Sequence, residues 1–478
     1  MDYSSGPSLG PSVAEILESH LSGSGSPTKT AARVADAIEC RGDDGTWLST
    51  VPREELLAAA RDIENRPGAR ALPLYGVPFG VKDSIDVEGV PTTLSCPDFA
   101  YVPTSTATVV QRLLDAGALY VGKTNLDQFA TGLNGTRTPY PVPRSVYGGN
   151  MISGGSSSGS ALAVALGQVP FAVATDTAGS GRVPAALNGV IGFKPSRGLI
   201  STVGLVPACK SLDCVTLMAS CIDDVDRAFS VMAGRDDDDA WSRERGPAYS
   251  GAPIRVAMPP VEELEFFGDE EMKRGHLAFR NRLAAQMPVV EVSLAPFIAA
   301  GELLYQGPWV AERLVVFGEF LAAQPDSIFP VVRDILRSGE KYTAVDAFSA
   351  LQRLQELKAE VGRLWQQMDV FVVPTIGTTF TVEEVLARPI DTNTMLGHYT
   401  HFGNLLDLLG VAVPLGTLTD GRPYSATLLG GAQTDDVALQ LAAQILDEPR
   451  ESPSCSPQKS SPQKSSPQKS DITSEEHV

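Results

Sequence analysis

Two loops built from small residues constrain this sequence more than any other feature. The first is Gly154-Gly155-Ser156-Ser157-Ser158-Gly159-Ser160, and the second is Thr175-Asp176-Thr177-Ala178-Gly179-Ser180-Gly181-Arg182. The stretch between them is apolar and predicts a helix over 158–166 and a buried strand over 170–173. Loops of this kind expose consecutive backbone N–H groups and let a substrate approach closely. We therefore expect Ser156 and Ser180 to meet in one site.

A serine hydroxyl is a weak nucleophile unless a base accepts its proton. The chain has five histidines, and none lies near either loop. Lys82, however, ends the apolar run 74–81 and enters a polar turn. Because burial disfavours the charged form of lysine, a neutral Lys82 could deprotonate Ser180 through Ser156 as a relay.

Asp176 and Arg182 lie within the second loop, on either side of Ser180. Asp176 could be a catalytic acid, but a carboxylate that anchors the loop amides by hydrogen bonds is the better interpretation. We expect Arg182 to hold the same loop or neighbouring carboxylates.

Gly80-Val81-Lys82-Asp83, Gly154-Gly155-Ser156 and Ala178-Gly179-Ser180-Gly181-Arg182 together resemble the amidase signature family. A Gly/Ser-rich loop by itself is typical of a flexible linker, but here three motifs agree in order and spacing. The resemblance implies that Lys82 is the base, that Ser156 is the relay in a cis peptide, and that Ser180 is the nucleophile. It further implies an oxyanion hole made by the backbone N–H groups of Thr177, Ala178, Gly179 and Ser180. It implies no metal and no organic cofactor.

Within that family, several stretches resemble the allophanate hydrolases in particular. They are residues 125–133, 136–140, 175–182, 307–313 and 402–408. In that subfamily a Tyr and an Arg eight residues apart hold the substrate's carboxylate, and the matching residues here are Tyr305 and Arg313.

Short apolar stretches alternate with helical patterns through the middle of the chain, which predicts an α/β fold. The expected strands are 74–81, 118–123, 170–173, 191–195, 203–206, 254–258, 369–374, 411–415 and 425–430. The expected helices are 106–116, 126–133, 158–166, 220–233, 269–287, 343–368 and 435–446, with a helical region over 28–63. The resemblance implies the amidase signature fold, with a central mixed β-sheet covered by helices.

The composition changes at both ends. We expect residues 1–27 to be loosely ordered, 28–449 to form the amidase signature domain, and 450–478 to be a disordered tail. The tail holds three Ser-Pro-Gln-Lys-Ser repeats, which start at Ser456, Ser461 and Ser466 and lack the apolar side chains needed to fold. The repeats could be phosphorylated by a proline-directed kinase or could be a solvated tail without a function, and we favour the second interpretation.

Charge and composition exclude several classes of function. The net charge of −19 argues against nucleic-acid binding, which needs a basic surface. No run of 18 apolar residues and no signal sequence occurs, so we expect a cytoplasmic protein without a membrane contact. His398 and His401 form an HxxH pattern, but a metal site on a helix needs an i, i+4 spacing and a carboxylate nearby. Both histidines are better explained as core or surface residues.

The resemblance therefore implies an amidohydrolase of the Ser-cisSer-Lys type, which we expect to release ammonia from allophanate in urea degradation. The expected partner is a small-molecule amide, and a homodimer is left open. One alternative is an amidase for another small carboxylated or simple amide. Two others are the amidase subunit of a tRNA-dependent amidotransferase and a non-catalytic binding protein that keeps the fold.

Overall fold

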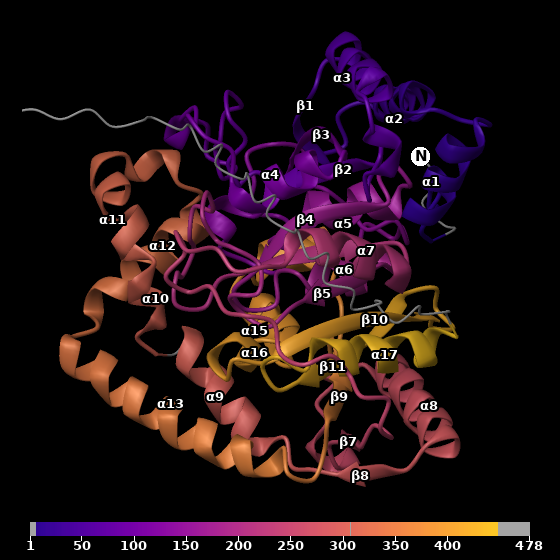
Figure 1. Ribbon diagram of the computed structural model, residues 1–478. Helices are drawn as coiled ribbons and strands as arrows, with labels where there is room; N and C mark the ends of the chain where they lie inside the picture. The colour runs from indigo at the N-terminus through magenta and orange to yellow at the C-terminus, as the bar shows by residue number, and fades with distance from the viewer. Residues whose placement is uncertain (1–5, 306, 448–478) are drawn as a thin grey trace, which may run out of the picture.

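The computed structural model describes residues 6–305 and 307–447, apart from the side chain of Tyr305. In this part of the chain eleven strands form one mixed sheet, in the order β1-β3-β2-β4-β6-β5-β10-β11-β9-β7-β8 (Figure 1). The strands are β1 Trp47–Thr50, β2 Pro78–Lys82, β3 Leu119–Thr124, β4 Phe171–Asp176, β5 Ile191–Lys194, β6 Cys214–Ala219, β7 Val256–Met258, β8 Val289–Glu291, β9 Val370–Pro374, β10 Leu409–Thr417 and β11 Pro423–Gly430.

Two adjacent parallel strands bring the predicted site residues to one edge of the sheet. β2 pairs with β4 in a register that places Phe79 opposite Phe171 and Val81 opposite Val173. Both strands are buried along their whole length, which explains their continuous apolar sequence. Since parallel strands end at the same edge, the last residues of the two strands, Lys82 and Asp176, lie on the same side of the molecule.

Helices surround the sheet and separate its core into several clusters. They are α1 Val13–Ser22, α2 Pro27–Arg41, α3 Arg53–Asn65, α4 Thr108–Asp115, α5 Ser158–Ala165, α6 Val183–Asn188, α7 Ile222–Met232, α8 Glu270–Gln286, α9 Ala295–Tyr305, α10 Trp309–Glu312, α11 Leu314–Ala323, α12 Pro330–Ser338, α13 Ala344–Leu364, α14 Val382–Ala387, α15 Asp391–Gly397, α16 Phe402–Leu405 and α17 Asp435–Leu446. Side chains of α4, α7 and α17 share one apolar core with the sheet, and those of α9, α13 and α16 share another. No helix among those described is long and apolar enough to cross a membrane.

The short helix α5 follows the first small-residue loop and is buried at every position. Small side chains are required there because the backbone of α5 approaches its neighbours closely. A Cβ at Gly159 would collide with the carbonyl of Thr46 and the backbone nitrogen of Asn125. The helix therefore positions the loop before it, which contains Ser156, against the sheet.

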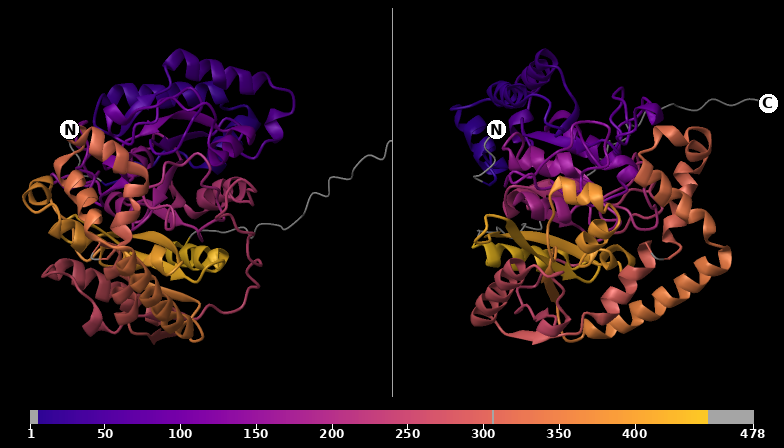
Figure 2. Two further views of the ribbon diagram at one scale, coloured as in Figure 1. Left: turned by 90° about the vertical axis from the view of Figure 1, so that its left-hand side faces the viewer. Right: turned by 180° about the vertical axis from the view of Figure 1, so that it is seen from behind.

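Helices α9–α13 gather on one side of the molecule, where they are coloured salmon to orange (Figure 2). The sequence predicted only the last of them, and its capping box, in which Thr343 and Asp346 bond reciprocally, marks the start of α13. The predicted substrate residue Arg313 lies within this group, between α10 and α11.

Three sequence-based expectations differ from the structure. Residues 126–133 do not form a helix, because Phe129 and Ala130 adopt positive φ angles and only a 3₁₀ turn is present. Residues 203–206 do not form a strand and contribute only a single bridge, between Leu205 and Ile85. The region 28–63 is interrupted by β1, which pairs with β3.

The segment before residue 28 is more ordered than we expected. Ser12 caps α1 through a capping box with Glu15, and the backbone N–H of Val13 donates to Asp224 of α7 at 2.7 Å. The side chains of Val13 and Ile16 are buried in the main core. The predicted tail, residues 450–478 with its repeats, lies outside the described residues.

Candidate active site

Lys82 lies at the end of β2, fully buried. Its Nζ donates to three hydroxyl groups, those of Ser156 at 2.8 Å, Ser157 at 2.9 Å and Thr175 at 2.7 Å. None of these acceptors is charged, so the hydrogen bonds favour an ammonium much less than a carboxylate would. The structure thus joins two of the three predicted catalytic residues directly.

Burial lowers the pKa of Lys82 to about 7. The negative charges of Asp127, Asp213 and Asp176 act in the opposite direction and raise this pKa, and the positive charge of Arg313 lowers it further. Because the resulting value lies near neutrality, a large fraction of Lys82 is uncharged at physiological pH and can accept a proton.

The peptide bond between Gly155 and Ser156 is cis, as the resemblance implied. The carbonyl of Ser156 accepts a hydrogen bond from the backbone N–H of Asp127 at 3.0 Å. The carboxylate of Asp127 in turn accepts from the backbone N–H groups of Gly135 at 3.1 Å and Arg137 at 3.0 Å. Asp127 therefore positions Ser156, the predicted relay residue, a role that the sequence alone did not suggest.

Ser180 lies in the loop between β4 and α6, which is anchored from within by Asp176. Its carboxylate accepts from the N–H groups of Gly179 at 2.8 Å and Gly181 at 3.0 Å, and it forms an ion pair with Arg182 at 2.9 Å. Burial raises the pKa of Asp176, but the Arg182 pair and the amide hydrogen bonds outweigh burial and lower it overall. The anchoring roles predicted for Asp176 and Arg182 are confirmed.

Four backbone N–H groups were predicted to form the oxyanion hole. The N–H of Gly179 donates to Asp176 and is therefore already engaged. The N–H groups of Thr177, Ala178 and Ser180 have no acceptor among the described residues. Three of the four predicted donors are thus available to an oxyanion in this structure.

Asp213, which the sequence did not single out, holds the same loop from outside. It accepts a hydrogen bond from the hydroxyl of Thr177 and another from the backbone N–H of Cys209 at 3.0 Å. Burial raises the pKa of Asp213 to about 6, although these hydrogen bonds and the charge of Arg313 lower it. Asp213 lies just before β6 and belongs to no recognisable sequence motif. Its position beside the Ser180 loop becomes visible only from the pairing of β6 with β4.

Arg313 follows α10 directly and is 3% exposed. One of its guanidinium nitrogens donates to the hydroxyl of Thr131 at 2.8 Å, and within the described residues it has no carboxylate partner. Its charge lowers the pKa values of both Lys82 and Asp213, so it lies within electrostatic range of the reaction centre. Tyr305 is the last residue of α9, but its side chain lies outside the described part of the structure and its role stays a prediction.

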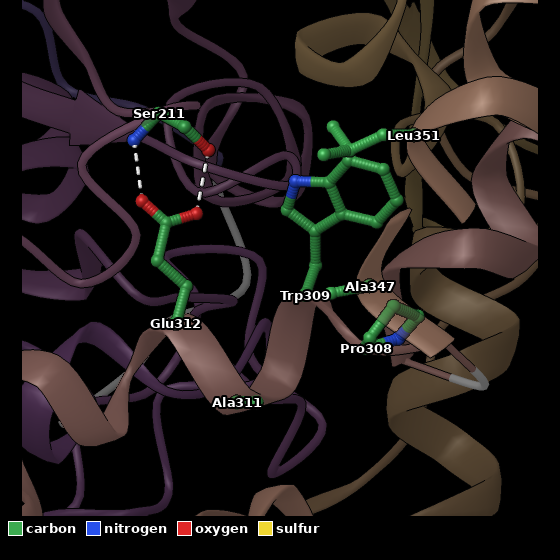
Figure 3. Close-up of a pocket in the computed structure, with 7 residues that line it drawn as sticks. All are labelled: Ser211, Pro308, Trp309, Ala311, Glu312, Ala347 and Leu351. Atoms are coloured by element: carbon green, nitrogen blue, oxygen red, sulfur yellow. Dashed lines mark hydrogen bonds between the residues drawn. The ribbon is translucent and has the colours of Figure 1, made fainter. Parts of the chain in front are cut away.

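A cavity of about 420 Å³ lies beside α10 but is not the reaction centre (Figure 3). It is lined by Ser211, Pro308, Trp309, Ala311, Glu312, Ala347 and Leu351. Glu312 points toward Ser211 and accepts two hydrogen bonds from it, from the backbone N–H at 2.7 Å and from the hydroxyl at 2.5 Å. The cavity thus lies against α10, the helix that ends directly before Arg313.

One contact expected from the relay is not formed. The hydroxyl of Ser180 makes no hydrogen bond to Ser156 or to any other described residue, although its loop and that of Ser156 both lie beside the ends of β2 and β4. His398 and His401 do not belong to any cluster of metal-ligating side chains within the described residues. Burial lowers the pKa of His401 to about 3, as is typical of a neutral core histidine.

Comparison with known proteins shows a consistent similarity. The family model described as Amidase matches residues 35–439. The urea amidolyase of Saccharomyces cerevisiae is 42% identical over 449 residues, which cover 91% of this chain and 24% of that protein. A glutamyl-tRNA(Gln) amidotransferase subunit of Symbiobacterium thermophilum is 31% identical over 467 residues, covering 90% of this chain and 92% of that one.

The solved structure of Kluyveromyces lactis allophanate hydrolase matches with a TM-score of 0.87 and 40% sequence identity. The match covers 92% of this chain and 73% of that one. This chain spans about a quarter of the length of the yeast urea amidolyases that it matches.

Proposed function

We propose that this chain, which belongs to the amidase signature family and is an amidohydrolase, acts on allophanate and releases ammonia from it in urea degradation. The similarity to the K. lactis allophanate hydrolase and to the yeast urea amidolyases supports this substrate. We expect the enzyme to work in the cytoplasm on a free small molecule.

The observation that carries the proposal is the position of Arg313. It is a buried guanidinium with no carboxylate partner among the described residues, and it lies within electrostatic range of Lys82. A buried cation without a counter-ion is costly, so an anionic group of the substrate is the natural partner. Allophanate has a carboxylate at one end and an amide at the other, and a planar guanidinium fork can hold that carboxylate bidentately.

In the proposed mechanism, neutral Lys82 accepts the proton of the Ser156 hydroxyl, which accepts the proton of Ser180. The Ser180 Oγ then attacks the terminal carbamoyl carbon and forms a tetrahedral oxyanion. The free N–H groups of Thr177, Ala178 and Ser180 stabilise this oxyanion, and each such donor contributes ~10²–10³ in rate.

The tetrahedral intermediate collapses as the C–N bond breaks. The proton held by Lys82 returns through Ser156 to the leaving nitrogen, which departs as ammonia. Water, deprotonated by the same pair of residues, then attacks the acyl-enzyme ester and releases N-carboxycarbamate, and Ser180 regains its proton. The buried position of Lys82 supports this role because the residue can alternate between its two protonation states near pH 7.

Two alternatives have specific support. An amidase for another small carboxylated amide would use the same Arg313. The amidase subunit of a tRNA-dependent amidotransferase is supported by the relative from S. thermophilum, which this chain covers almost completely. That function requires glutamine as substrate and partner subunits that bring the ammonia acceptor.

The test is ammonia release by the purified chain with allophanate, biuret, malonamate, glutamine and a simple uncharged amide. We expect kcat/KM to be highest for allophanate and lowest for the uncharged amide. A preference for malonamate would support the carboxylate-binding role of Arg313 but would mean that allophanate is not the substrate. A preference for glutamine, or activity only with co-purifying subunits, would overturn the proposal in favour of the amidotransferase function.

A further inference from the structure

A second cavity, of about 280 Å³, lies between α13 and the loops that follow α16 and β11. Figure 1 shows α13 along the outer edge of the molecule. The lining residues that matter here are Lys358 and Trp365 of α13, Asp407 and Leu408 after α16, and the backbone at Gly431. None of the residues assigned to the active site lines this cavity.

Positive charge gathers around this cavity. Asp407 lines the cavity and forms an ion pair with Arg243 at 2.7 Å. Arg197 lies 3.8 Å from the other carboxylate oxygen of Asp407. The charged groups that act on Lys358 are Asp407, Arg197 and Arg243. Arg197 and Arg243 thus share one carboxylate, and Lys358 lines the same cavity, in a chain whose net charge is −19.

Among these three cations, Lys358 is the one that forms no direct ion pair with a described residue. It is half-buried, and within the described residues no hydrogen bond or ion pair satisfies its ammonium group. Burial and the two arginines lower the pKa of Lys358, and Asp407 raises it. Placing a lysine beside two arginines costs free energy unless an anion joins them.

The arginines behind Asp407 are fixed in place. Arg197 donates to the carbonyl of Ser211 and stacks on the ring of Trp241, with 4.7 Å between the guanidinium carbon and the ring centroid. Arg243 is held by its ion pair with Asp407. A ligand would therefore meet positive charge that is already ordered, which lowers the entropic cost of binding.

We propose that this cavity is a binding site for a small dianion, either a phosphate or a dicarboxylate. Lys358 contacts the ligand directly, and Arg197 and Arg243 supply the field that favours two negative charges over one. Trp365 and Leu408 form the apolar wall, which suits a small organic body attached to the anionic groups.

The test is calorimetric titration of the full-length chain with inorganic phosphate and with succinate, and with acetate as a monoanion at matched ionic strength. We expect saturable binding of phosphate or succinate and none of acetate. Lys358→Gln should weaken binding by at least about tenfold. Lys29→Gln removes one positive charge from exposed α2 and should leave binding unchanged.

Each result decides the matter. Binding of phosphate alone assigns a phosphorylated ligand, binding of succinate alone assigns a dicarboxylate, and either supports the site if Lys358→Gln weakens it. Lack of saturable binding by both dianions would overturn the proposal. So would binding that survives in Lys358→Gln but is lost in Arg313→Lys, because it would then belong to the active site. Melting temperatures of all variants check that each remains folded.

Discussion

The Nζ of Lys82 lies 2.8 Å from the hydroxyl of Ser156, and both groups are completely buried. This contact joins the end of a central strand to a loop 74 residues further along the chain. The proton path proposed for the reaction starts here, so changes to these two residues, or to the groups that hold them, should act on turnover.

Replacing Ser180 or Lys82 with alanine should abolish turnover. Nucleophile and base act as a unit, so we expect losses of similar size, of ~10³ or more in kcat. Ammonia release measures the loss, and labelling by a fluorophosphonate probe, detected by mass spectrometry at Ser180, identifies the nucleophile. Near-normal turnover of Lys82→Ala would contradict the lysine relay.

The pH dependence of kcat/KM should show an acidic limb with an apparent pKa of about 7, because Lys82 must be neutral to accept a proton. Activity falls as pH drops through this value and reaches a plateau above it. The charge of Asp213 raises the pKa of Lys82, so Asp213→Asn should move the limb to lower pH. A limb that does not move, or that moves to higher pH, would exclude Lys82 as the titrating group.

Arg313→Lys should lower kcat/KM for allophanate by roughly tenfold or more. A charge-assisted hydrogen bond contributes about 1.5–3 kcal/mol, and lysine cannot reproduce the planar fork. Turnover of an uncharged amide should change much less. Arg337→Lys, the same change at an exposed position of α12, is the matched control. Equal losses on charged and uncharged substrates would mean that Arg313 only supports the fold.

Thr177→Val should lower kcat by about tenfold, with a small change in KM. The change removes the hydroxyl that donates to Asp213 and so loosens a loop whose amides must meet the oxyanion. Thr216→Val is the control, since this buried hydroxyl on β6 has no hydrogen-bond partner among the described residues. If both variants lose activity equally, the Asp213 contact has no special role.

Gly155→Ala should destabilise the protein and lower its activity. An added Cβ would collide with the carboxylate of Asp127 and lie 2.8 Å from the backbone nitrogen of Gly135. Gly318→Ala within α11 meets no close neighbour and should stabilise the fold by about 0.5–1 kcal/mol. Thermal unfolding of both variants measures the contrast, and a Gly155→Ala variant as stable as the wild type would refute the close packing.

The candidate site residues that could be predicted from the sequence are those that belong to local sequence motifs. Lys82 follows an apolar run, and Ser156 and Ser180 lie in loops of small residues, so each carries its own signal. Asp127 and Asp213 carry no such signal, because their importance comes from contacts with segments distant in sequence. Only the folded structure brings Asp127 to the carbonyl of Ser156 and Asp213 to Thr177.

Residues 126–133 show why the secondary structure was wrong in places. Their apolar spacing is compatible with a helix, yet tertiary contacts decide otherwise. The backbone N–H of Asp127 donates to Ser156, and Phe129 packs against Phe317 of α11 with 4.4 Å between ring centroids. Strand β1 was missed for a similar reason, since its four residues gain their pairing only from β3.

The contact between Glu312 and Ser211 has a consequence for selectivity. Glu312 precedes Arg313, and Asp213 follows Ser211 by two residues and holds Thr177. Hydrogen bonds and the short backbone segments between them therefore connect Arg313, which would bind the substrate's carboxylate, to the amides that would receive its carbonyl oxygen. Through such a connection, the binding energy of the substrate's carboxylate can lower the activation free energy of the reaction at its carbonyl group. An analogue without the carboxylate should accordingly react slowly even when it saturates the enzyme, so discrimination would appear in the maximal rate as well as in the half-saturating concentration.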